Sequence, residues 1–177
     1  YVTLQNGNYK EAVQLASQFL KLEDWKELGN PLRNEVIGVL SSASRNEGQR
    51  LNDKGNLHEA GSLLSSIGNE FSDIPDREKS LRDGAFMLAV AGDWNSVYAT
   101  TTSYLSEKLK RYAPEMNYLL ARSLEFQMRF SEASKQFLKT AKDFPSFNKT
   151  DRCLTRAEAL AVADDDFETA GQSAFMQ

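Results

Sequence analysis

The six-residue stretch GNYKEA, residues 7–12, comes close to reappearing four more times along the chain of 177 residues. The further copies are GNLHEA (55–60), GDWNSV (92–97), MRFSEA (128–133) and DDFETA (165–170). The sixth positions of successive copies lie 48, 37, 36 and 37 residues apart. A period in the mid-thirties is typical of solenoids that are built from helical hairpins.

Each position of the repeated motif has a physical role at a corner between two helices. Gly7 can adopt the left-handed conformation that commonly ends a helix. Asn8 is a favoured N-cap, and Glu11 can complete a capping box; Asn56 and Glu59 repeat this pair. The sixth position is small in every copy: Ala12, Ala60, Val97, Ala133 and Ala170. The motif therefore predicts a helix–short turn–helix corner that occurs five times.

Helical periodicity flanks these corners. The residues expected on buried helix faces are Leu81, Ala85, Leu88 and Ala89, then Leu120, Ala121, Leu124 and Met128, and finally Ala133, Phe137, Leu138 and Ala141. Prolines at 31, 75, 114 and 145 separate the helical segments. The long first interval predicts an elongated helix near 31–53, capped by Asn30, and an insertion around Trp25 of unassigned role. No stretch alternates with period two, so the fold class is all-α.

Composition limits the possible functions. The chain is 41% apolar and 26% charged, as is usual for a folded domain. Its 25 acidic and 21 basic residues give a net charge of −4, which disfavours nucleic-acid binding through phosphate neutralisation. Its one cysteine, Cys153, excludes an internal disulfide. No apolar run is long enough for a membrane span.

The corners and their spacing resemble the tetratricopeptide repeat (TPR) family. The best-matched unit is 114–147, where the residues at family positions are Leu120, Ala121, Leu124, Ala133, Phe137 and Pro145. The second unit matches through Gly48, Leu51, Gly55, Ala60 and Leu64. Two residues depart from the family pattern, because Ala121 replaces a glycine of the first helix and Met128 replaces a glycine of the turn. The longer spacing also resembles that of bacterial cell-envelope TPR proteins.

The resemblance implies a right-handed superhelical solenoid of antiparallel helix-turn-helix repeats, in one domain over 1–177. The expected repeat units are 1–29, 30–74, 75–113, 114–147 and 148–177. Such a stack presents a long groove lined by the first helix of each hairpin, which suits a peptide or protein partner. The expected function is a non-catalytic scaffold or adaptor, without cofactor or metal. A bacterial periplasm or envelope location is favoured, with the cytoplasm as the alternative.

Residues that point away from the buried faces of the first helices are candidates for partner binding. They are Arg45, Gln49, Asn52, Lys79, Arg82, Phe86, Tyr118, Arg122, Glu125, Arg152 and Thr155. Four arginines among them, at 45, 82, 122 and 152, could form a cationic ladder that pairs with acidic groups of a partner. The alternative is that these residues are ordinary solvated helix surface.

Two other classes of function remain as alternatives. An enzyme would need a pair such as His58 and Cys153, but His58 is expected on an exposed corner and Cys153 in a packed helix. The acidic stretch ADDDFETAG (163–171) lacks calcium-ligand spacing, so Asp165 and Asp166 are expected to cap the last helix. The third class is a self-assembling platform, in which the apolar residues Ala170, Ala174, Phe175 and Met176 at an exposed repeat end form a homo-oligomer.

Overall fold

The structure is a computed structural model that describes residues 5–22 and 30–177. The described residues form helices and turns and contain no strand, which confirms the all-α prediction for this part of the chain. The chain divides into two compact units, Tyr1–Met87 and Leu88–Gln177. The predicted insertion around Trp25 lies outside the described residues.

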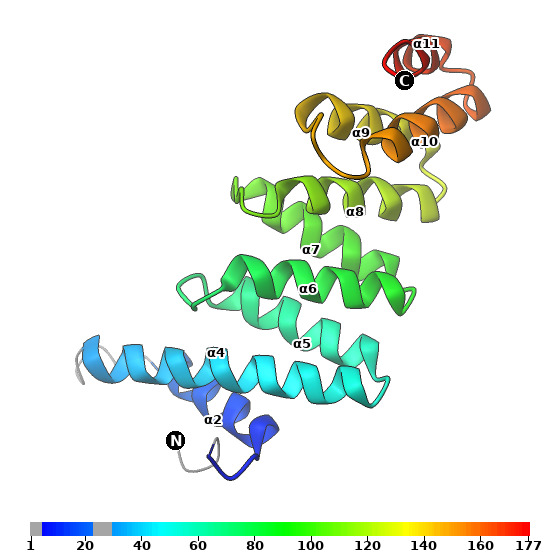
Figure 1. Cartoon of the computed structure of the whole chain (residues 1–177). Helices are drawn as coiled ribbons and strands as arrows, with labels where there is room; N and C mark the ends of the chain where they lie inside the picture. Colours follow the sequence, from blue (N-terminus) through cyan, green and yellow to red (C-terminus); the bar gives the residue numbers. More distant parts are fainter. Residues whose placement is uncertain (1–4, 23–29) are drawn as a thin grey trace. The chain divides into compact units, whose positions relative to one another are not determined.

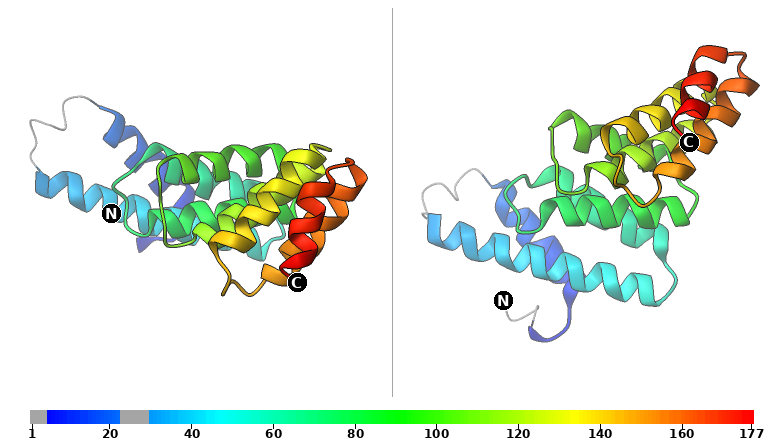
Figure 2. Two further views of the ribbon diagram at one scale, coloured as in Figure 1. Left: turned by 90° about the horizontal axis from the view of Figure 1, so that it is seen from above. Right: turned by 45° about the horizontal axis from the view of Figure 1, so that its top comes forward.

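The first unit contains α2 (Tyr9–Lys21), α4 (Asn30–Asp53), α5 (Leu57–Glu70) and most of α6 (Arg77–Val90). Helix α4 packs against α2 on one side and α5 on the other (Figure 1). At 24 residues, α4 is the elongated helix that the first interval predicts, and it is visible in cyan in Figure 2. The core of the first unit comprises Ala12, Val13, Ala16, Ile37, Leu40, Ala43, Ile67, Phe71 and Ile74.

The second unit contains α7 (Trp94–Ser106), α8 (Ala113–Phe126), α9 (Phe130–Asp143), α10 (Thr150–Ala163) and α11 (Phe167–Phe175). Each of these helices packs against the next, and α11 also touches α9. The orange α10 and red α11 lie side by side in Figure 2. Helices that are neighbours in sequence are therefore neighbours in space within each unit, as in a helical repeat.

The first residue of all five motif copies has a left-handed backbone. The φ angles are +77° at Gly7, +78° at Gly55, +81° at Gly92, +59° at Met128 and +55° at Asp165. At the last four corners this geometry closes the preceding helix, because the next N–H bonds back to a carbonyl five residues earlier. These bonds are Asn56 to Leu51, Asp93 to Leu88, Arg129 to Leu124 and Asp166 to Ala161, at 2.8–3.0 Å. These four predicted corners are thus confirmed as helix-ending turns.

The sixth residue of every copy is buried, as expected for a position where two helices approach. Ala60, Val97 and Ala133 are 0% exposed, Ala12 is 1% and Ala170 is 8% exposed. The expected burial of Ala133, Phe137, Leu138 and Ala141 is confirmed as well. Met128 is an exception among the predicted core residues, because its side chain is 78% exposed. It belongs to the turn after α8, which ends at Phe126, so the helical face does not extend to it.

The methionine at the fourth corner is expected to lower stability. A residue with a side chain in the left-handed region costs about 1–2 kcal/mol relative to the right-handed one, and the exposed Met128 side chain recovers little by packing. We expect Met128→Gly to raise the free energy of unfolding by about 0.5–1 kcal/mol, after the larger chain entropy of glycine is counted. Urea denaturation followed by circular dichroism measures this difference.

The reciprocal change at the third corner is the matched control. A Cβ added to Gly92 would meet no atom within 4 Å, so only the backbone is affected. Gly92→Met should lower the free energy of unfolding by about 1 kcal/mol. If both variants shift stability in the same direction, left-handed strain is not the cause.

The corners differ in how their N-caps work. The predicted capping boxes at Asn8 and Asn56 are wrong, because neither asparagine side chain makes a cap hydrogen bond. Asn8 Nδ2 instead donates to the side chain of Glu11, at 3.5 Å. Aspartates do cap: Asp93 accepts from Ser96 N–H at 3.1 Å, and Asp166 from Thr169 N–H at 3.0 Å. The predicted cap at Asp166 is confirmed, whereas the neighbouring residue at 165 forms the left-handed turn.

The Asp166 cap should make the free energy of unfolding depend on pH. The Thr169 backbone N–H and then its hydroxyl lower the pKa of Asp166, with a smaller contribution from Lys135. The folded state therefore favours the carboxylate form of Asp166. The cap then contributes to the free energy of unfolding at pH values above the ordinary aspartate pKa of about 3.9. This contribution is lost as the pH falls through the lowered pKa. We expect the stability difference between the parent chain and Asp166→Asn to shrink over that acidic range.

Asp165→Asn is the charge-matched control for this measurement. It removes the same charge at the same corner, but residue 165 is exposed and is not the N-cap of α11. Its stability difference from the parent chain should vary less with pH than that of Asp166→Asn. Equal pH profiles for the two variants would show that the effect comes from net charge and not from the cap.

Candidate functional site

A small hollow in the first unit gathers three of the predicted partner-binding residues. Arg45 and Gln49 of α4 and Lys79 of α6 line it together. The hollow measures about 120 Å³, and its remaining lining residues are Leu64, Ser80, Asp83 and Met87. Residues about 30 positions apart in sequence thus meet here because the first helices of two successive hairpins contribute to one surface.

The cations around this hollow are paired with carboxylates of the same unit. Arg45 lies 3.2 Å from Asp76. Lys79 Nζ lies 3.2 Å from one carboxylate oxygen of Asp83, and Arg82 Nε lies 3.1 Å from the other. Three positive and two negative side chains leave this surface nearly neutral, so the predicted ladder does not form an unopposed cationic surface in this unit. The other predicted residues here are Gln49, which donates to Asp53 at 2.6 Å, the half-buried Asn52, and Phe86, which is 55% exposed.

In the second unit, Glu125 joins α8 to α10. Its carboxylate forms ion pairs with Arg156 of α10 and with Arg122 of its own helix, the latter at 3.6 Å. The Glu125 side chain is only 11% exposed, compared with 39% for Arg156. Glu125 therefore holds two guanidinium groups in place, and it is less available to a partner than predicted. Arg156 was not among the predicted residues.

An aromatic pair adjoins these arginines. The rings of Trp94 and Phe126 stack with centroids 4.1 Å apart and planes 5° apart. The guanidinium of Arg122 lies 4.9 Å from the Phe126 centroid and 6.0 Å from that of Trp94. Phe126 remains 51% exposed, so a flat apolar surface lies next to a fixed cation. Trp94 belongs to one of the predicted corner motifs, whereas no motif in the sequence indicated Phe126.

Tyr118 is buried, which corrects the expectation that it lies on the exposed face of its helix. It is 7% exposed and packs edge-on against Phe137 and Phe147, with centroids 5.9 and 6.3 Å away. The neighbouring helix α9 and the α9–α10 connection cover it, which the periodicity of α8 alone does not reveal. Arg152 and Thr155 on α10 are exposed, and the Thr155 hydroxyl donates to the backbone carbonyl of Asp151.

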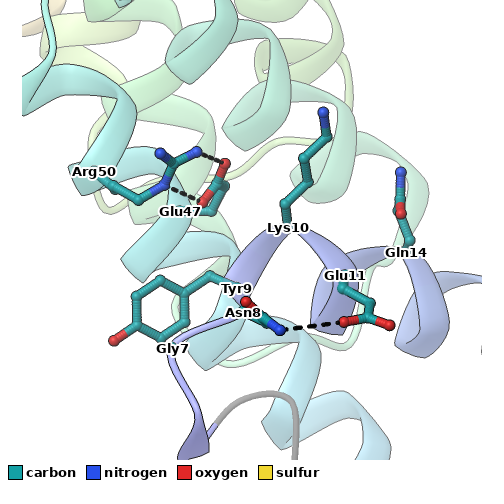
Figure 3. Close-up of a pocket in the computed structure, with 8 residues that line it drawn as sticks. All are labelled: Gly7, Asn8, Tyr9, Lys10, Glu11, Gln14, Glu47 and Arg50. Atoms are coloured by element: carbon teal, nitrogen blue, oxygen red, sulfur yellow. Dashed lines mark hydrogen bonds and ion pairs between the residues drawn. The ribbon is translucent and has the colours of Figure 1, made fainter.

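A larger hollow at the start of α2 was not predicted. Two adjoining cavities of about 380 and 300 Å³ share Lys10, Gln14, Glu47 and Arg50. Glu47 is 4% exposed, and Arg50 donates two hydrogen bonds to it, at 2.5 and 2.7 Å (Figure 3). These bonds lower the pKa of Glu47 despite its burial. The only sequence signal was the Glu–Arg spacing of three residues on one helix, which is common on helix surfaces.

The residues considered for catalysis are placed in different surroundings. His58 is an exposed residue in the first turn of α5, in the first unit. Cys153 is fully buried in α10, and this burial raises the pKa of its thiol to about 11. A thiol with a raised pKa is protonated at neutral pH and is a poor nucleophile. No group of three potential ligands for a metal ion occurs among the residues that the structure describes.

Comparisons with protein-family models, curated protein sequences and solved structures find no match to this chain. Over residues 5–22 and 30–177, no helix combines the length and the apolar character needed to cross a membrane.

Proposed function

We propose that this chain is a helical-repeat module of the tetratricopeptide type that binds a protein or peptide partner without catalysis. The observation that carries the proposal is the hollow formed jointly by α4 and α6. In the proposed right-handed solenoid, the first helices of successive hairpins line one groove, and side chains such as Gln49 and Lys79 contact the partner. The five corners of one geometry support the repeat architecture.

The shape and charge of the hollow also favour recognition of a polypeptide. The hollow is far smaller than the cavities of about 300–1,000 Å³ that hold small-molecule ligands. It offers an exposed amide, paired charges and apolar side chains within one surface. An extended peptide can place one side chain in such a hollow and hydrogen-bond along the adjoining helices.

A steric block tests this proposal. The tagged chain is used to capture partners from cells that express it, and the captured proteins are identified by mass spectrometry. Gln49→Trp should fill the mouth of the hollow and reduce the recovered partner at least tenfold. Glu35→Trp is the matched control, because residue 35 is an exposed glutamate of the same helix and does not line the hollow. Equal recovery with both variants would contradict binding at this surface.

Self-association is the second candidate, and it is supported by the exposed apolar residues of α11. Phe175 is 92% exposed, and Met176, directly after the helix, is 39% exposed. Ala170 does not contribute, because it is buried against the rest of the unit. Sedimentation at increasing protein concentration should show a dimer that Phe175→Ser abolishes. A monomer at every concentration would leave partner binding as the sole proposal.

A further inference from the structure

The surface shared by α8 and α10 carries more positive than negative charge. Arg122, Arg152 and Arg156 lie on these two helices, and Glu125 is the one carboxylate that is ion-paired with any of them among the described residues. Arg152 and Arg156 are four residues apart on α10, so they project from the same side of that helix. The other acidic residues of α10, Asp151 and Glu158, lie about 100° or more around the helix from Arg152 and Arg156. Glu115 of α8 lies two turns before Arg122 on the same side of its helix, so the surface has an excess of about one positive charge.

Glu125 restrains the two arginines that are paired with it before any partner arrives. Glu125 forms ion pairs with both, and the Arg122 guanidinium also lies over the stacked rings of Phe126 and Trp94. Arginine side chains normally lose conformational entropy when they bind a carboxylate, and prior fixation reduces this loss. One carboxylate between two guanidinium groups leaves net positive charge, which favours binding of an additional anion.

The exposed Phe126 adds an apolar requirement. It follows Arg122 by one helical turn and, although stacked on Trp94, is 51% exposed. A ligand with only negative charge would leave this ring in water, and an apolar ligand would leave the arginine charge unmatched. The complementary ligand carries a carboxylate next to an apolar side chain.

We infer that the α8–α10 surface binds a polypeptide segment in which an acidic residue neighbours an aromatic or aliphatic residue. The acidic side chain contacts Arg152 and Arg156, and the apolar side chain packs on Phe126. This inference rests on the proposed function. It names the chemical class of the partner and adds the α8–α10 surface as a second binding surface beside the hollow of α4 and α6. Phe126 and Arg156 become specificity residues that the repeat pattern does not indicate.

Peptide titration tests the assignment directly. The probe is the acetylated and amidated peptide Glu-Asp-Phe-Glu-Leu-Asp. One control peptide has Gln and Asn in place of the acids, and another has Ser in place of Phe and Leu. The chain has two tryptophans, so Trp25→Phe leaves Trp94 as the only indole that reports binding. We expect saturable binding of the probe, and at least tenfold weaker binding of both control peptides.

Variants locate the site. Arg152→Gln and Phe126→Ser should each weaken probe binding about fivefold to tenfold, and the Arg152→Gln/Arg156→Gln pair should weaken it further. Arg152→Gln leaves the Glu125 ion pairs intact. Weaker probe binding by this variant would therefore not be explained by the loss of a structural ion pair. Lys139→Gln, which removes an exposed charge on α9, should change nothing. Thermal melts followed by circular dichroism verify that each variant is folded.

The outcomes separate this inference from the proposed function. Equal binding of the neutral peptide, equal binding of a single-stranded oligonucleotide, or no saturation up to about 1 mM probe would overturn the α8–α10 assignment. If a cellular partner is still captured by the Arg152→Gln and Phe126→Ser variants, the proposed function stands and this second surface is wrong. If the unmodified chain captures no partner but still binds the probe, the α8–α10 assignment stands and the proposed partner binding at the hollow of α4 and α6 is wrong.

Discussion

Replacement of Phe137 by alanine is expected to lower the free energy of unfolding by about 3–5 kcal/mol. Phe137 is 0% exposed and lies on α9, where α8 and α10 both pack against it. Its ring meets Tyr118 edge-on, and the surrounding side chains include Leu124, Leu154 and Cys153. The substitution removes the largest fully buried side chain of this cluster and leaves a cavity that the helices on both sides must collapse to fill.

Phe167→Ala is the matched control for the Phe137 substitution. The same atoms are removed from another helix of the second unit, but Phe167 is 69% exposed. Its effect should stay within about 0.5 kcal/mol. Urea denaturation, monitored by Trp94 fluorescence in a Trp25→Phe background, reports on the unit that contains both sites. A loss below about 1 kcal/mol for Phe137→Ala would show that this cluster is not the core of the unit.

Replacement of Gly84 by alanine should also destabilise the chain, by about 1–3 kcal/mol, although it adds only one methyl group. A Cβ at this position of α6 would lie 2.8 Å from the backbone nitrogen of Ser65 and 2.9 Å from the carbonyl oxygen of Gly61. Both atoms belong to the backbone of α5 and cannot rotate away. The two helices would therefore have to separate, which weakens the packing along their whole contact.

Gly38→Ala is the control, and the opposite sign is expected for it. Gly38 lies inside α4, where an added Cβ would meet no atom within 4 Å. Alanine should raise the free energy of unfolding there by about 0.5–1 kcal/mol, because it favours the helical backbone. Urea denaturation of both variants by circular dichroism tests the pair. A stabilising Gly84→Ala would mean that α5 and α6 do not approach closely at this point.

Tertiary packing selected among alternatives that the sequence left open. The repeat pattern placed Tyr118 and Glu125 on the same exposed helix face as Arg122. Tyr118 is covered by Phe137 and Phe147, and Glu125 is held between two arginines, one of which comes from the next hairpin. Helical periodicity identifies which side of a helix is apolar, but it does not identify the side chains of the helix that will lie opposite.

The sequence by itself determined the five corners and the buried faces beside them. A left-handed turn residue and a small sixth residue act within a few positions of each other, so Gly55 to Ala60 carries its own structural information. The packed residues of α9 follow from the same local periodicity, as Phe137 and Ala141 show. These features depend on backbone conformation and solvent exclusion, which are encoded over short distances in the chain.

Only the tertiary structure decided the close contact at Gly84, the ion pairs of Glu125 and the hollow beside Glu47. Each depends on residues of two different helices that are far apart in the chain: Gly84 lies 19 residues after Ser65, Arg156 lies 31 residues after Glu125, and Glu47 lies 37 residues after Lys10. The distance and rotation between packed helices set these contacts. The same charged residues are solvated surface or a binding site according to what the neighbouring helix places opposite them.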